Sequence, residues 1–355
     1  MPEFSIGKRR VGDAHPSYFI ADISANHDGD LGRAKALIHL AAESGADAAK
    51  FQNFRARHIV SDHGFRQLGT GKSHQSRWKK SVSEVYQAAS LPWEWTEALA
   101  KECRAAKIDY FSAPYDLEAV DMLDAHVDLY KIGSGDISWP EMIVKVAGKG
   151  KPVLLATGAS TLADVQRAVG LLRAARVPFS LMQCNTNYLG SVENFRHVHL
   201  NVLNGYRALF PDAVPGLSDH TPGSVTVLGA VALGARTIEK HFTDDNSREG
   251  PDHPFSMNPV SWREMVDRTR ELESALGRPD KDVADNERDT VVIQRRCLRA
   301  ARPLSAGRAL GRADIEVLRP APLDAIFPYD LDKVLGRKPR RAIEAGDYFR
   351  WNDLD

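Results

Sequence analysis

The stretch YFIADISANHDGDLGRAKALIHLAAESGADAAKFQNF, residues 18–54, decides the fold class. It begins with an apolar, β-branched run over 18–25 and continues as an amphipathic helical pattern over 31–44, which Gly45 ends. A second apolar run follows over 48–54. This order is one βα unit followed by the strand of the next unit, which is typical of an α/β protein.

The same alternation continues along the chain. Further strands are predicted over 109–113, 129–133, 152–157, 178–184, 214–219 and 236–242. Helical patterns lie between or after them, over 93–107, 117–126, 140–147, 162–175, 192–209, 223–233 and 262–276. Eight βα units in about 260 residues predict a (β/α)8 TIM barrel.

Three segments fall outside this repeat and predict the domain organisation. About forty residues separate the second strand from the third, and the polar first half, 55–80, is typical of a functional lid. The charged stretch GRPDKDVADNERD predicts a linker, and short apolar runs with Gly and Pro turns follow it. We therefore expect a barrel over 1–278, a linker over 279–290 and a small β-rich domain over 291–355.

Composition excludes several classes of partner. Lys+Arg and Asp+Glu both count 47, so no net field attracts nucleic acid or an anionic membrane. Three cysteines are too few for a disulfide framework, which favours a reducing compartment. The chain starts without an apolar signal region and has no run long enough to span a bilayer. We expect a cytoplasmic protein that binds neither nucleic acid nor membrane.

Polar side chains recur at the C-terminal ends of the predicted strands, where barrel enzymes form their active sites. They occupy alternate positions, so they would point into the barrel mouth together. These residues are Asp22, Lys50, Gln52, Lys131, Ser218, His220, Glu239 and His241, with Ser134 following three positions after Lys131. Because a barrel core does not require these residue types, they indicate a site.

His220 and His241 end neighbouring strands, so both imidazoles could bind one divalent metal ion, with Glu239 as a ligand or beside one. Two unrelated histidines explain the pattern about equally well, because two ligands do not define a metal site.

Lys50 and Lys131 would point into the same mouth, where two ammonium groups repel each other unless an anion lies between them. A phosphate or a carboxylate is therefore expected. Pairing of a lysine with Asp22 or Glu239 is an equally good interpretation.

Six segments, read together, resemble the N-acetylneuraminate (sialic acid) synthase family. They are ISANHDGDLGRAK, GADAAKFQ, YKIGSGD, LLATGAS, GLSDHTPG and ALGARTIEKHFTDDNSREGPDHPFSMNP. The tail is similar to that family's C-terminal antifreeze-like (SAF) domain. GLSDHTPG and the EKHFT…GPDH segment are the most specific of these motifs, and the resemblance covers nearly the whole chain.

The resemblance implies condensation of phosphoenolpyruvate with an open-chain N-acetylated hexosamine, giving a nine-carbon 2-keto-3-deoxy acid and phosphate. It implies Mn²⁺ or Mg²⁺ on His220 and His241, and a domain-swapped homodimer in which Arg319 reaches the partner's acceptor. The catalytic residues expected on this basis are Asp22, Lys50, Lys131, Glu239 and Asp252. The expected substrate-binding residues are Gln52, Ser134, Thr157, Asn185, Thr186, Tyr188, Ser218 and Arg319.

The chain departs from the family pattern at four positions. Asp22 replaces a usual Glu, Ala113 a usual Thr, Ala156 a usual Ser and Thr186 a usual Asn, so hydroxyl contacts to phosphoenolpyruvate are absent or come from Thr157. An alternative activity is a related phosphoenolpyruvate-dependent synthase with another aldose acceptor, such as a phosphorylated one, although the SAF-like tail argues against it. A non-catalytic sugar-binding barrel is disfavoured because burying both lysines and both histidines is costly without an anion and a metal.

Overall fold

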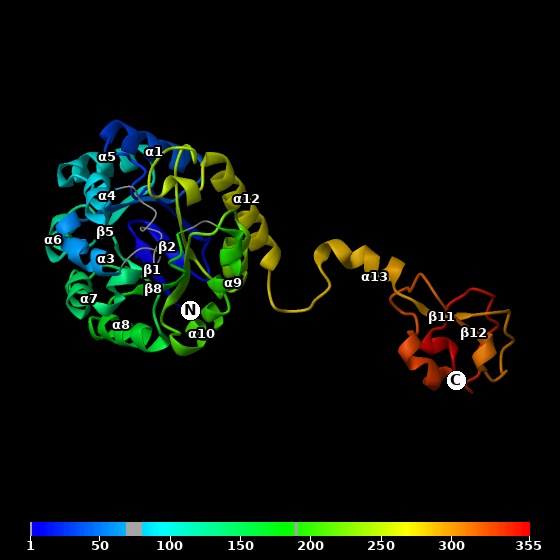
Figure 1. Cartoon of the computed structure of the whole chain (residues 1–355). Helices are drawn as coiled ribbons and strands as arrows, with labels where there is room; N and C mark the ends of the chain where they lie inside the picture. Colours follow the sequence, from blue (N-terminus) through cyan, green and yellow to red (C-terminus); the bar gives the residue numbers. More distant parts are fainter. Residues whose placement is uncertain (1, 69–79, 189–190) are drawn as a thin grey trace. The chain divides into compact units, whose positions relative to one another are not determined.

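The structure of the protein, a computed structural model, describes residues 2–68, 80–188 and 191–355 (Figure 1). The chain divides into two compact units, Met1–Gly277 and Arg278–Asp355. Each unit is described by itself below.

The first unit is the predicted (β/α)8 barrel. Within the described residues its sheet contains eight strands in the order β5-β4-β3-β10-β9-β8-β7-β6, all paired in parallel. The strands are β3 (Tyr18–Asp22), β4 (Ala48–Asn53), β5 (Asp109–Pro114), β6 (Tyr130–Ile132), β7 (Val153–Ala156), β8 (Phe179–Cys184), β9 (Val214–Asp219) and β10 (Thr237–His241). Strands β5 and β6, at the two ends of this order, lie against each other, which closes the barrel.

Helices surround the sheet as predicted (Figure 1). They are α1 (Leu31–Glu43), α5 (Thr96–Ala106), α6 (Leu117–Leu123), α7 (Pro140–Ala147), α8 (Leu162–Ala174), α11 (Val225–Ala232) and α12 (Pro259–Leu276). The start of α1 is fixed by Asp30, whose side chain accepts a hydrogen bond from the Arg33 amide. The prediction of one helix over 192–209 is wrong: a 3-10 turn, α9 (Phe195–Val198) and α10 (Val202–Leu209) replace it, because His199 takes a left-handed conformation between them.

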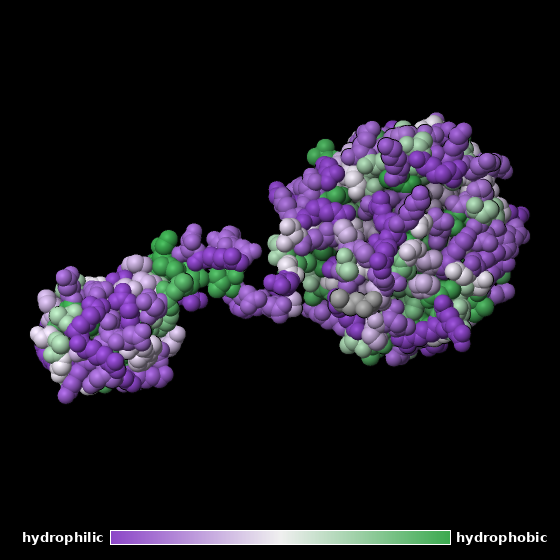
Figure 2. Space-filling view, turned by 180° about the vertical axis from the view of Figure 1, so that it is seen from behind, coloured by the Kyte–Doolittle hydropathy of each residue, from purple (hydrophilic) through white to green (hydrophobic). Residues whose placement is uncertain are grey.

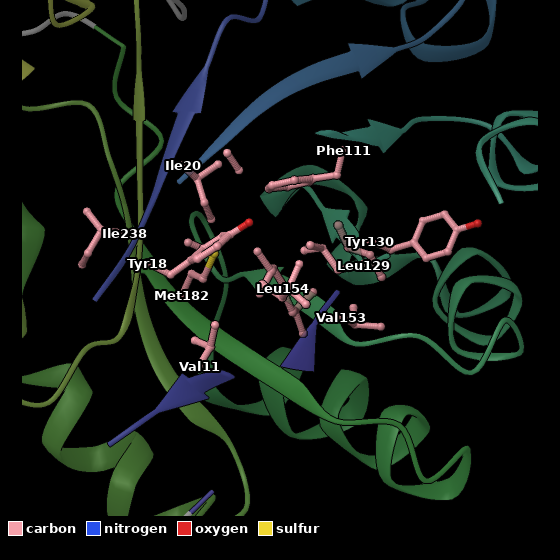
Figure 3. Close-up of a cluster of buried hydrophobic side chains, with 14 of the residues drawn as sticks. Val11, Tyr18, Ile20, Phe111, Leu129, Tyr130, Val153, Leu154, Met182 and Ile238 are labelled. Atoms are coloured by element: carbon pink, nitrogen blue, oxygen red, sulfur yellow. The ribbon is translucent and has the colours of Figure 1, made fainter. Parts of the chain in front are cut away.

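A hairpin that the sequence analysis missed precedes the barrel. Strands β1 (Glu3–Ile6) and β2 (Arg9–Gly12) pair antiparallel around Gly7, whose positive φ suits the tight turn. Val11 of β2 belongs to the same buried cluster as Tyr18, Ile20 and Met182 (Figure 3). Strands of four residues are too short to give a periodic sequence signal.

Short helices occupy much of the segment between β4 and α5, which was predicted as a lid. They are α2 (Ala56–Ile59), α3 (Asp62–Leu68) and α4 (Val82–Ala89). Helix α4 begins with a capping box in which Ser81 and Glu84 bond each other's backbone amides. Part of the predicted lid, residues 69–79, lies outside the described residues.

The second unit is small and irregular, with its own core. It contains α13 (Arg288–Gln294), the antiparallel strands β11 (Cys297–Ala300) and β12 (Ile315–Leu318), and α14 (Leu331–Val334). Leu298, Ile326 and Phe349 are fully buried in this core. Apolar side chains gather on α13 (Figure 2), where Ile293 is 58% exposed. No described helix is long and apolar enough to cross a membrane.

Candidate active site

A cavity of about 380 Å³ opens at the C-terminal ends of the barrel strands. The strand register brings the predicted residues to one level, because Asp22 lies opposite Lys50 on one side and His241 on the other. The cavity is lined by ten of the predicted residues on the strands and the loops that follow them: Asp22, Lys50, Gln52, Lys131, Ser134, Ser218, Glu239, His220, His241 and Asp252. Tyr188 lines it as well.

Charged pairs form the floor of the cavity. The Lys50 Nζ lies 2.7 Å from Asp22 Oδ2 and 3.4 Å from Glu239 Oε1, and Lys131 Nζ donates to the same Glu239 oxygen at 2.9 Å. These four side chains are almost completely buried. Pairing with acids, the second interpretation of the two lysines, is therefore what the structure contains, and burial of the lysines does not by itself require an anion.

Mutual attraction favours the charged forms of Glu239 and Lys50. Burial alone would raise the pKa of Glu239, but the charges of Lys131 and Lys50 outweigh it and lower the pKa to about 2. Burial would likewise lower the pKa of Lys50, yet Asp22 and Glu239 raise it. The floor thus contains two lysines and two acids. An incoming anion must therefore replace a carboxylate as the partner of a lysine.

The two histidines lie side by side in the cavity wall, with ring centroids 5.3 Å apart. His220 donates through Nδ1 to the Asn185 backbone carbonyl at 2.9 Å, which leaves Nε2 as the unprotonated nitrogen of the neutral ring. Burial, and then repulsion from His241, lower the pKa of His220 to about 4. The ring is therefore neutral at physiological pH, as a metal ligand must be.

The residues around the histidine pair fit a divalent ion. Within the described residues His241 Nδ1 is buried without a hydrogen-bond partner, 3.6 Å from Asp252 Oδ2, and His241 Nε2 lies 3.5 Å from Asp22 Oδ2. Glu239 Oε2 is another buried atom without a partner in this part of the chain. Imidazole nitrogen and carboxylate oxygen are both common ligands of divalent metal ions. The described residues contain no group of three or more His, Cys, Asp or Glu placed to hold a metal ion.

Neutral donors lie beside the lysines. Ser218 donates to Glu239 Oε1 at 3.1 Å, and Ser134 Oγ accepts from the Gly158 amide at 3.0 Å. A Cβ added at Gly158 would lie 2.5 Å from a methyl carbon of Thr186 and 2.9 Å from Ser134 Oγ. A glycine is therefore required for the Ser134 loop to approach the end of β7.

Three predicted contacts in the barrel lie outside the cavity lining. The Thr157 hydroxyl is buried, donates to the Met182 carbonyl and accepts from Tyr206. Asn185 acts on His220 through its backbone, while its side chain donates to the His197 carbonyl. Thr186 packs against Gly158. A fourth predicted residue, Arg319, belongs to the second unit. Direct roles of these residues on a substrate remain predictions.

Asp136 is a cavity residue that the sequence analysis did not select. It ends the YKIGSGD motif, in the 3-10 turn Ser134–Ser138 after β6, and its Oδ2 is buried without a hydrogen-bond partner among the described residues. Burial raises the pKa of this carboxyl to about 6. A carboxyl with a pKa near neutrality, in a cleft, is suited to proton transfer. The motif contained the signal, but the sequence analysis selected Ser134 of the same turn and passed over Asp136.

The upper part of the cavity has an apolar wall from the segment between β4 and α5. Phe54, Ile59, Val85, Tyr86 and Ala89 line it. The Phe54 ring contacts the Tyr86 ring at 5.5 Å, which joins β4 to α4. Of these five residues only Ile59 lies in the polar stretch 55–80, so most of the wall comes from Phe54 and from helix α4.

Comparisons with known proteins point to one family. A family model described as the NeuB family matches residues 37–281, and a model of the SAF domain matches residues 295–355. The N,N'-diacetyllegionaminic acid synthase of Campylobacter jejuni is 33% identical over 309 residues, 85% of this chain and 90% of that protein. The spore coat polysaccharide biosynthesis protein SpsE of Bacillus subtilis is 33% identical over 373 residues, 100% of this chain and 98% of that protein.

A solved structure extends the likeness to the fold. The crystal structure of an N-acetylneuraminic acid (sialic acid) synthetase from Leptospira borgpetersenii in complex with citrate has a TM-score of 0.71 and 26% identity to this chain. The match covers 81% of this chain and 95% of that one.

Proposed function

The chain belongs to the NeuB family and is a nonulosonic acid synthase of the phosphoenolpyruvate-condensing kind, and on this premise we propose which residues perform the reaction. The resemblance read from the motifs is thereby confirmed. The observation that carries the proposal is one cavity with a lysine–carboxylate floor, two adjacent histidines of which His220 is neutral, and a carboxyl of raised pKa. The reaction proposed for this cavity joins phosphoenolpyruvate to the open-chain aldehyde of an N-acetylated hexosamine.

Phosphoenolpyruvate binds at the floor. Lys50 and Lys131 hold its phosphate and carboxylate by exchanging part of their pairing with Asp22 and Glu239 for the substrate oxygens. Ser134 and Ser218 add neutral donors, and Gln52, whose amide donates to Asp22 at 3.1 Å, fixes that acid while the lysines exchange partners. Desolvation of the floor strengthens each of these contacts.

The acceptor aldehyde lies beside His220 and His241, which we propose hold a Mn²⁺ or Mg²⁺ ion. When bound there, such an ion would supply positive charge at the aldehyde oxygen and so make the carbonyl carbon more electrophilic. Asp252, held by the Ser24 hydroxyl at 2.5 Å, and Tyr188, whose ring lies 4.3 Å from that of His220, position the sugar hydroxyls.

The bond changes balance without a further reactant. C3 of phosphoenolpyruvate attacks the aldehyde carbon, and the former carbonyl oxygen takes a proton. Water adds at C2 and loses a proton, for which we propose Asp136 as the base because its carboxyl has a pKa of about 6 in the cavity. The C2–O bond to phosphate then breaks while the new C2 hydroxyl gives its proton to the departing phosphate, leaving the 2-keto-3-deoxy acid and inorganic phosphate. Lys131 faces the negative charge of the leaving phosphate.

We also propose the division of the chain into a catalytic domain over 1–278, a linker over 279–290 and an SAF domain over 291–355. In a domain-swapped homodimer, Arg319 would reach the acceptor in the partner's barrel. The three cysteines are free and buried thiols, which supports a cytoplasmic enzyme.

A panel of acceptors tests the proposal. The protein is incubated with Mn²⁺, phosphoenolpyruvate and, in turn, N-acetylmannosamine, its 6-phosphate, a 2,4-diacetamido-2,4,6-trideoxyhexose and arabinose 5-phosphate. We expect turnover of at least one N-acetylated hexosamine, with a product mass equal to the sum of the two substrates plus water minus phosphoric acid. Turnover of arabinose 5-phosphate alone would replace the proposal with the alternative activity.

A further inference from the structure

Two charged residues are buried near the site but do not line the cavity. Asp219, the last residue of β9, is 4% exposed, and Lys240 of β10 is 1% exposed. They are direct partners in the parallel register of the two strands. Their side chains point away from the barrel interior, because Ser218 and Glu239, one position earlier on each strand, point into it.

These residues form a closed set of polar contacts. Lys240 Nζ donates to Asp219 Oδ2 at 2.5 Å and to the Thr221 backbone carbonyl at 2.6 Å. Asp219 also accepts from the Thr226 hydroxyl at 2.7 Å and from the Thr221 hydroxyl and amide at 2.8 Å and 3.2 Å. Lys240 thereby ties the turn that follows β9 to strand β10, and Thr226 ties the same turn to the start of α11.

The turn held in this way carries His220. His220 lies between Asp219 and Thr221, both of which Lys240 contacts, and His241 directly follows Lys240 on β10. On the cavity side the two rings stand 5.3 Å apart, and the hydrogen bond of the His220 ring goes to the Asn185 carbonyl rather than to β10. The buried pair thus links the turn that contains His220 to the strand β10, which ends with His241.

Stability alone does not account for this pair. Removing two charges from water costs free energy that their attraction often fails to recover, and apolar residues of similar volume are commonly as stable in such positions. A barrel that needed only a packed layer between β9, β10 and α11 would be served by leucine and methionine. What apolar residues cannot supply is the directional contact to the Thr221 carbonyl.

We propose that Asp219 and Lys240 are positioning residues for the histidine pair. They fix the turn after β9 on the end of β10, so that the two imidazoles face one ion at a set separation. This inference rests on the proposed metal site. Residues that orient metal ligands without contacting the metal typically contribute about 10- to 100-fold to metal affinity.

The test compares the double variant Asp219→Leu/Lys240→Met with a matched control, Ser180→Ala/Thr237→Val. The control also removes a buried cross-strand polar pair that includes β10, since the Ser180 and Thr237 hydroxyls are 2.7 Å apart. For each protein, urea unfolding is measured in EDTA and Mn²⁺ affinity by electron paramagnetic resonance. Histidine ¹⁵N spectra of the metal-free protein report whether the His220 proton stays on Nδ1.

We expect the Asp219/Lys240 variant to unfold at a urea concentration no lower than that of the control variant, to bind Mn²⁺ about 10- to 100-fold more weakly and to show mixed His220 tautomers. The control should bind Mn²⁺ within about twofold of the wild type. A folded double variant with wild-type Mn²⁺ affinity and an unchanged His220 tautomer would overturn the inference.

If the double variant does not fold, Thr226→Val decides the question. It removes one donor to Asp219 and should weaken Mn²⁺ binding several-fold, whereas unchanged affinity and an unchanged tautomer would refute the positioning role. Failure of the wild type itself to bind Mn²⁺ would instead refute the proposed metal site, so the two failures are distinguishable.

Discussion

Replacing Asp136 with asparagine should make the barrel more stable at neutral pH while it removes catalysis. The reason is the environment of the carboxyl, which is mostly buried and, within the described part of the chain, has an oxygen without a hydrogen-bond partner and no ion pair with a cation. An amide of the same shape carries no charge into this environment. Burying the charge of the Asp136 carboxylate destabilises the folded protein. Such a cost is expected where a residue is kept for proton transfer rather than for stability.

The magnitude follows from the pKa. A carboxyl whose pKa is raised from 3.8 to about 6 destabilises the ionised folded state by at most about 3 kcal/mol, and residual contact with water reduces this to about 1–2 kcal/mol. The folded protein holds this proton more tightly than the unfolded chain, so the wild type loses stability as the pH rises from about 4 to about 6. The Asp136→Asn variant has no carboxyl to titrate at this position and lacks this loss.

Urea unfolding at pH 4.0 and pH 7.5 measures the effect. We expect Asp136→Asn to unfold at a higher urea concentration than the wild type at pH 7.5 and at nearly the same concentration at pH 4.0. The control is Glu264→Gln, which changes an exposed carboxylate on α12. Its urea midpoint of unfolding should equal that of the wild type at both pH values. In the wild type, kcat should rise with pH through about pH 6 as the Asp136 carboxyl loses its proton, whereas Asp136→Asn should show no turnover across this range. A variant that is less stable than the wild type at pH 7.5 would refute the account of this carboxyl.

Three further predictions concern other parts of the site. His241→Ala should abolish turnover and weaken Mn²⁺ binding by more than about 10-fold in a calorimetric titration; unchanged turnover would remove the metal assignment. Gly158→Ala should raise the KM for phosphoenolpyruvate about 10-fold while circular dichroism stays native, because its Cβ displaces Ser134, and an unchanged KM would separate Ser134 from the phosphate. Arg319→Ala should change the KM or kcat for the acceptor but not the KM for phosphoenolpyruvate; full activity after deletion of residues 291–355 would contradict the swapped dimer.

The barrel could be predicted from the sequence because each strand is a buried run between turn residues. Alternation along those runs also selected the floor correctly: Asp22, Lys50, Lys131 and Glu239 all line one cavity. Side chains of a strand alternate between its two faces wherever the strand lies in the fold. The face on which a residue lies can therefore be predicted from the sequence without knowledge of the long-range contacts.

Other parts depended on contacts that no local pattern encodes. Asp136 lies in a turn beyond its strand, where strand parity no longer applies. The pairing of Lys50 with Asp22 and of Lys131 with Glu239 was one of two interpretations, since charge alone does not say which partner is nearer. The sequence predicts that the Thr157 hydroxyl contacts the substrate. In the structure this hydroxyl donates to the Met182 carbonyl and accepts a hydrogen bond from Tyr206.

The central claim is that this cavity joins phosphoenolpyruvate to an aldehyde acceptor and releases phosphate in the same turnover. A single time course that records inorganic phosphate by ³¹P NMR and the keto acid by mass spectrometry tests it most directly. The account predicts one phosphate for each molecule of nine-carbon acid, and no phosphate when the N-acetylated hexosamine is omitted. Phosphate released at the same rate without any acceptor would contradict it.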